Sequence, residues 1–68
     1  MVLVFQTNIT TPLEKYARQL LSAFHEIITV DFDFEDVDNI LRIETQGNIA
    51  QEVELTINSK GLFCRELP

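Results

Sequence analysis

The sequence predicts an α+β two-layer sandwich, in which an antiparallel sheet carries two helices on one face. Two observations predict it: several segments alternate apolar and polar residues with a period of two, and two other segments space their apolar residues as a helix does. The expected order is strand, helix, strand, strand, helix, strand. With 68 residues, the chain has room for one core, and we expect a single domain over residues 1–68.

The first strand is expected at Val2 to Thr7, which is β-branched and aromatic and ends at a loop. A helix follows, with Pro12 at its first position and a capping box between Thr11 and Glu14. The apolar positions of this helix recur at helical spacing and are Leu13, Ala17, Leu20, Leu21 and Phe24.

The middle of the chain predicts a β-hairpin. From Ile28 the period becomes two, with Ile28, Val30, Phe32 and Phe34 on the apolar side. Residues 36–39 have turn chemistry, and a second alternating segment follows at once, with Leu41, Ile43 and Thr45 on one side and Arg42 and Glu44 on the other.

A second helix and a last strand complete the pattern. Asn48 can cap a helix that ends at Gly61 and buries Ile49, Ala50, Val53 and Ile57. Leu62 to Leu67 can form the last strand. Two β-α-β halves with right-handed crossovers give the split arrangement called ferredoxin-like; a swapped or β-paired dimer of the same elements is the alternative.

Composition narrows the class of partner. The net charge of −6 repels phosphate backbones and anionic headgroups, so neither nucleic acid nor a membrane is expected as a partner. No apolar run approaches the roughly 18 residues of a membrane span. One cysteine cannot close a disulfide within the chain, and the start of the sequence lacks a basic region before its apolar residues, so we expect a cytoplasmic protein.

The order of the elements, the segment Val30 to Glu35, the segment Leu41 to Ile43 and the Lys60-Gly61-Leu62 step together resemble a heavy-metal-associated domain. That family includes copper chaperones, and the resemblance covers nearly the whole chain. It implies a loop of pattern Met-x-Cys-x-x-Cys after the first strand, followed by apolar helix positions that correspond here to Ala17 and Leu21.

The positions that match the metal loop of this family are Asn8 for the methionine and Thr10 and Leu13 for the cysteines. Soft metal ions need thiolate ligands, which neither threonine nor leucine supplies. We therefore expect a copper-chaperone-like member without the metal-binding motif, with no metal ion and no cofactor.

Other candidate sites have simpler interpretations. The carboxylates between Asp31 and Asp38 resemble the start of a calcium loop, but its sixth position is Asp36 and its twelfth is Arg42, so a solvated strand and turn are expected. His25 is expected at the surface near the end of the first helix. Cys64 is expected to pack in the last strand as a small hydrophobe, and the alternative is a weak or partner-dependent metal ligand contributed by two chains.

An interaction surface is the remaining candidate. If Leu3 and Phe5 face the helices, Val2, Val4 and Ile40 lie on the open face of the sheet, and Leu55 lies off the apolar stripe of the second helix. The chain has no nucleophile paired with a base and no phosphate-binding glycine loop, so no enzyme is predicted. We expect a non-enzymatic interaction or regulatory module with a protein partner or self-association; the alternative is a metal chaperone or sensor with unconventional ligands.

Overall fold

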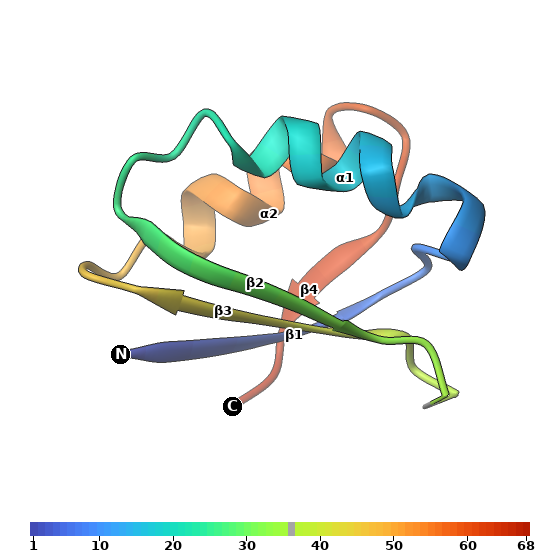
Figure 1. Ribbon diagram of the computed structural model, residues 1–68. Helices are drawn as coiled ribbons and strands as arrows, with labels where there is room; N and C mark the ends of the chain where they lie inside the picture. The colour runs from blue at the N-terminus through green and yellow to red at the C-terminus, as the bar shows by residue number, and fades with distance from the viewer. Residues whose placement is uncertain (36) are drawn as a thin grey trace.

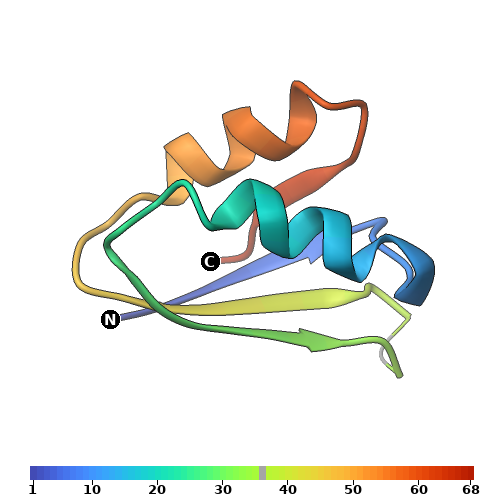
Figure 2. The ribbon, with the colours of Figure 1, turned by 45° about the horizontal axis from the view of Figure 1, so that its top comes forward.

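The computed structural model describes residues 1–35 and 37–68. A four-stranded sheet forms one layer and two helices form the other (Figure 1). The elements are β1 (Val2–Thr7), a short 3₁₀ turn η1 (Thr11–Leu13), α1 (Glu14–Leu21), β2 (Ile27–Asp33), β3 (Ile40–Thr45), α2 (Ala50–Asn58) and β4 (Cys64–Glu66). The fold is therefore α+β, with both helices over the same face of the sheet (Figure 2).

The strands follow the order β2-β3-β1-β4, and all neighbouring pairs are antiparallel. β1 lies between β3 and β4, with Leu3 opposite Ile43 and Thr7 opposite Cys64. The hairpin expected between the second and third strands is confirmed, because β2 pairs antiparallel with β3. Strands β1 and β3 are central, whereas β2 and β4 are the two edges of the sheet.

The core lies between the sheet and the helices. It includes Leu3, Phe5, Leu41 and Ile43 from the sheet and Ala17, Leu21, Val53 and Ile57 from the helices. These are the faces that the two sequence periods predict. Burying one large aliphatic or aromatic side chain stabilises the fold by about 1.5–3 kcal/mol, so the small domain depends on this single cluster.

The start of the first helix differs from the prediction. Residues 11–13 form a 3₁₀ turn, neither this turn nor α1 has a side-chain cap, and the expected capping box between Thr11 and Glu14 is wrong. Glu14 instead accepts a hydrogen bond of 2.8 Å from Arg18 Nε, one helical turn further on. The Glu14 carboxylate therefore forms an i,i+4 ion pair with Arg18 and does not cap the helix.

The first residues of β2 also differ from the prediction in which side chains face the helices. A β-bulge between Ile27 and Thr29 shifts the register, so that Ile27 lies opposite Thr45 and packs against the core. Ile28, expected on the apolar side, is 56% exposed. An extra residue in one strand changes the face of its neighbours, which a strict period of two cannot indicate.

Ile40 corrects another expectation. The register places it on the open face, as predicted, opposite Asp33 on one side and Gln6 on the other. It is nevertheless only 6% exposed and does not belong to the main core. Its position opposite two strands at once, with cross-strand neighbours about 5 Å away on either side, leaves it less exposed than Val2 at the start of β1.

Candidate functional site

The loop after β1 is packed into the core and hydrogen-bonded to the chain before β4. Ile9 is fully buried in the core. Asn8 pairs with the backbone of Phe63, since its side-chain Oδ1 accepts from the Phe63 backbone amide at 2.7 Å and its backbone N–H donates to the Phe63 carbonyl at 3.3 Å. The carbonyl of Thr10 accepts from the amide of Leu13 at 2.8 Å. Of the three positions that match a metal loop, Asn8 is thus engaged in joining this loop to the chain before β4.

Cys64 faces the core from β4 and is 2% exposed, as its expected packing requires. Burial, and secondarily the carboxylate of Glu54, raise the pKa of the Cys64 thiol from 9.0 to about 12. A thiol that stays protonated is a poor nucleophile and a poor metal ligand. No group of three or more metal-ligating side chains lies together in residues 1–35 and 37–68.

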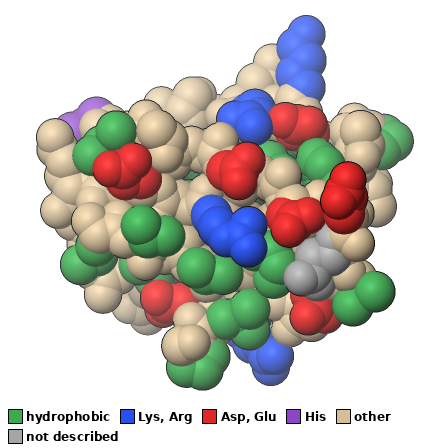
Figure 3. All heavy atoms as spheres, turned by 60° about the horizontal axis from the view of Figure 1, so that its bottom comes forward, with side chains coloured by type: hydrophobic (Ala, Val, Ile, Leu, Met, Phe, Trp, Pro, Cys, Tyr) green, Lys and Arg blue, Asp and Glu red, His purple; other side chains and the backbone are tan. Residues whose placement is uncertain are grey.

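The open face of the sheet carries an apolar patch at β1 and the C-terminal end of the chain. Val2 is 63% exposed and Val4 is half-buried, and with Leu67 and Pro68 they line a hollow of about 680 Å³. Figure 3 looks onto this face, where hydrophobic side chains lie among charged ones of both signs. Leu67 and Pro68 were not among the expected surface residues, although Leu67 continues the open-face alternation past Arg65.

Leu55, the remaining residue of the expected surface, is 65% exposed on α2. It belongs to the helical layer, so it cannot share one surface with Val2 and Val4. The structure therefore divides the expected interaction residues into an open-face pair, a buried Ile40 and a separate Leu55.

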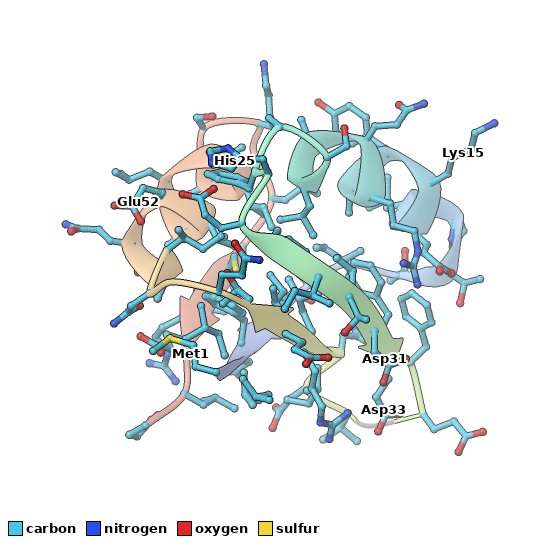
Figure 4. The ribbon with its side chains drawn as sticks, turned by 60° about the vertical axis from the view of Figure 1, so that its left-hand side comes forward. Met1, Lys15, His25, Asp31, Asp33 and Glu52 are labelled. Atoms are coloured by element: carbon cyan, nitrogen blue, oxygen red, sulfur yellow. The ribbon has the colours of Figure 1, made fainter. Side chains whose placement is uncertain are left out.

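His25 and the acidic cluster lie at the surface. His25 follows α1 and is exposed, with its Nδ1 3.6 Å from a carboxylate oxygen of Glu26. Asp31 and Asp33 project side by side from β2 on the side away from the helices (Figure 4). Asp36, which belongs to the same predicted cluster, lies outside the described residues.

A groove between α1 and β2 is the feature that sequence reasoning missed. It has a volume of about 420 Å³, and its lining includes Arg18, Phe24, Ile27, Ile28 and Val30. Arg18 crosses it: Nη1 donates to the carbonyl of Val30 at 3.0 Å, and the guanidinium carbon lies 5.4 Å from the centre of the Phe32 ring. The alternation of apolar and polar residues in β2 indicates which side chains face the helices. It does not indicate that β2 lies at an edge of the sheet.

The comparisons with known proteins return no relative. No family model, no curated protein and no solved structure matches the chain. In the described residues, no helix is long and apolar enough to cross a bilayer.

Proposed function

We propose that this chain is a non-enzymatic protein-interaction module with a ferredoxin-like arrangement, related to heavy-metal-associated domains but lacking their metal ligands. The element order and the β2-β3-β1-β4 strand order support the fold assignment. The observation that carries the function is the apolar patch of Val2, Val4 and Leu67 on the open face of a sheet whose other face packs against the helices.

The proposed occupant of this patch is a protein partner with a flat apolar surface. The register places Arg42 beside Val4 and Arg65 beside Gln6, while Glu44 lies beside Val2. Apolar residues rimmed by charges of both signs are typical of protein interfaces, whereas a nucleic acid or an anionic membrane requires a basic surface.

Metal binding through Cys64 of two chains is the alternative. It requires the thiol to leave the core and lose its proton, against burial and the nearby Glu54 carboxylate. We therefore propose that reduced wild-type protein does not bind Cu(I) or Zn(II) tightly. Anaerobic titration against a competing chelator tests this, and stoichiometric tight binding by the wild type would overturn the non-metal proposal.

A gain-of-function variant supplies the positive control for that titration. Thr10→Cys with Leu13→Cys places thiols at the two positions that match the family's cysteines. If this loop corresponds to the family's loop, the double variant gains a tight Cu(I) site, provided that circular dichroism shows it folded. A folded double variant without a gain would contradict the correspondence.

The interface itself is tested with matched substitutions. Val4→Glu and Leu55→Glu each put one negative charge on an apolar surface site, at half-buried Val4 in the sheet layer and at exposed Leu55 in the helical layer. We expect immobilised wild type and Leu55→Glu to retain the same protein from an extract of the source cells, and Val4→Glu to lose it. Retention by Val4→Glu together with loss by Leu55→Glu would refute the open-face assignment.

A further inference from the structure

The two edges of the sheet differ in how their backbone groups are satisfied. At β4, the side chain of Asn58 accepts from the Cys64 amide at 3.1 Å and donates to the Cys64 carbonyl at 3.0 Å. The carboxylate of Glu54 accepts from the Glu66 amide at 2.6 Å. Arg65 lies opposite Gln6, so the backbone groups of Cys64 and Glu66, on either side of it, point away from β1. Side chains of α2 therefore satisfy both outward groups of Cys64 and the outward amide of Glu66.

The outward groups of β2 can be derived from the register. Thr45 exchanges backbone hydrogen bonds with Met1 on the β1 side, of 2.8 and 2.9 Å. Backbone groups alternate along a strand, so Ile43 and Leu41 also point toward β1. Their partners on the other side, Val30 and Phe32, must therefore turn both N–H and C=O outward.

Only part of this edge is occupied. Over residues 1–35 and 37–68, the Arg18 guanidinium on the Val30 carbonyl is the single side-chain hydrogen bond to the backbone of β2. The Val30 amide and both backbone groups of Phe32 have no partner there. An edge of seven residues with free donors and acceptors is a template for an added strand.

The negative charges beside β2 determine which kind of strand can pair with this edge. Asp31 and Asp33 extend from β2 on the open-face side, and Asp31 makes no ion pair with any described residue. Asp33 lies 3.9 Å from Arg42. A second copy of this acidic chain, with its net charge of −6, would add like charges at this edge. A partner strand with lysine or arginine on that side would add opposite ones.

The groove between α1 and β2 determines which residues fit on the helix-facing side of the added strand. Its walls include the half-buried side chains of Phe24, Ile27 and Val30, on the helix-facing side of β2. Side chains of a strand alternate between faces, so every second residue of the partner would lie over this groove. We propose that β2 binds an extended segment of a partner protein, in which basic residues alternate with apolar ones, as a fifth strand of the sheet.

In the bound state, an amide of the partner takes the place of Arg18 on the Val30 carbonyl. The guanidinium is then released, and its positive charge moves away from the lysines of the partner. This surface is distinct from the open-face patch around Val4, so either proposal can fail without the other.

The probe is a blocked peptide of alternating lysine and valine, about eight residues long to match a strand. Binding is measured by fluorescence anisotropy at about 20 mM salt, where surface charges are weakly screened. A peptide with the same composition in two blocks is the control. We expect the alternating peptide to bind more tightly, since only its basic and apolar residues separate onto opposite faces.

Substitutions localise the binding. Asp31→Asn with Asp33→Asn should weaken the alternating peptide about three- to tenfold, as expected for losing two exposed charge pairs. A matched substitution elsewhere, Glu52→Gln on α2, should not weaken it. Arg18→Ala should tighten binding more than Lys15→Ala, because Lys15 points away from β2 at the start of α1 (Figure 4). Equal tightening by both would contradict the displacement of Arg18.

Hydrogen exchange followed by NMR is the decisive measurement. Saturating peptide should slow exchange at the amides of Val30 and Phe32 and leave Val53 in α2 unchanged. Absence of binding would overturn the proposal, as would binding without protection at Val30 and Phe32, which would show electrostatic attraction without an added strand. Protection at these amides with equal affinity for both peptides would overturn the alternating sequence requirement.

Discussion

The two edge strands of the sheet, β2 and β4, each belong to one β-α-β half of the chain, but their outward backbone groups are satisfied to different extents. β4 has three residues, and Asn58 and Glu54 of α2 hydrogen-bond to its outward backbone groups, whereas β2 has seven residues and, in residues 1–35 and 37–68, accepts one side-chain hydrogen bond on its backbone, from Arg18 of α1. Asn58 is short and lies at the end of α2, so its amide meets both backbone groups of Cys64 in a fixed geometry. Arg18 is long and exposed, and it contacts one carbonyl. A short edge can be completed within the domain, while a long one is left available to a partner.

The largest expected effect concerns the thiol of the closed edge. The folded-state pKa of Cys64 is about 12 against an ordinary value of 9.0. Because the folded state holds this proton more tightly, the contribution to stability is fully present below pH 9 and is lost as the pH rises toward 12. At about 1.4 kcal/mol for each pH unit, the free energy of unfolding should fall by roughly 3–4 kcal/mol across this range.

Urea denaturation at several pH values checks this, with Cys64→Ala as the control. The informative quantity is the difference between wild type and variant, because it isolates the contribution of the thiol. Parallel pH profiles for the two proteins would mean that the thiol ionises without leaving the folded core.

Removing the side chain that closes β4 should cost more than removing the one at β2. Asn58→Ala leaves the amide and carbonyl of Cys64 without their partners, and we expect a loss of about 2–3 kcal/mol in the free energy of unfolding. Arg18→Ala removes exposed contacts and should cost under about 1 kcal/mol. The comparison is made by urea denaturation at neutral pH, and equal losses would show that β2 depends on Arg18 as β4 depends on Asn58.

A smaller effect is expected at the turn that leads into β4. Gly61 lies in the turn after α2 and has a φ of 82°, and a Cβ at this position would meet no atom within 4 Å. Gly61→Ala should therefore cost only the backbone strain, about 1–2 kcal/mol. Gly47, which also has open space around it but no positive φ, is the matched control, and Gly47→Ala should change the melting temperature little. Similar shifts for both variants would exclude a specific role of the left-handed turn.

Local patterns predicted β1, β3 and the buried face of α2 well. Val2 to Thr7 forms the expected strand, and Leu41, Ile43 and Thr45 are buried while Arg42 and Glu44 are exposed. The last strand is shorter than expected, with Cys64–Glu66 in place of Leu62 to Leu67. Asn48 accepts a hydrogen bond from the amide of Ala50 at 3.2 Å, consistent with its expected role at the start of α2. Alternation and helical spacing succeed where one face is buried along the whole element.

The two failures near the first helix have different causes. Glu14 binds Arg18 and not the helix start, and Ile9, a loop residue between Asn8 and Thr10, is buried as deeply as Phe5. The Glu14–Arg18 pair has the i,i+4 spacing of a helix, so the sequence does contain a signal for it. The burial of Ile9 has no periodic signal, because it depends on what the folded chain brings alongside.

The sequence by itself determined the order of the elements, the faces of β1, β3 and α2, the acidic character of the surface and the absence of thiols at Thr10 and Leu13. Only the tertiary structure decided which strands became edges, that Asn58 closes one of them, and that Val30 and Phe32 turn their backbone groups outward at the other. The physical reason is that side-chain periodicity is a property of each strand alone, whereas the pairing of backbone donors and acceptors depends on which strand lies next to it.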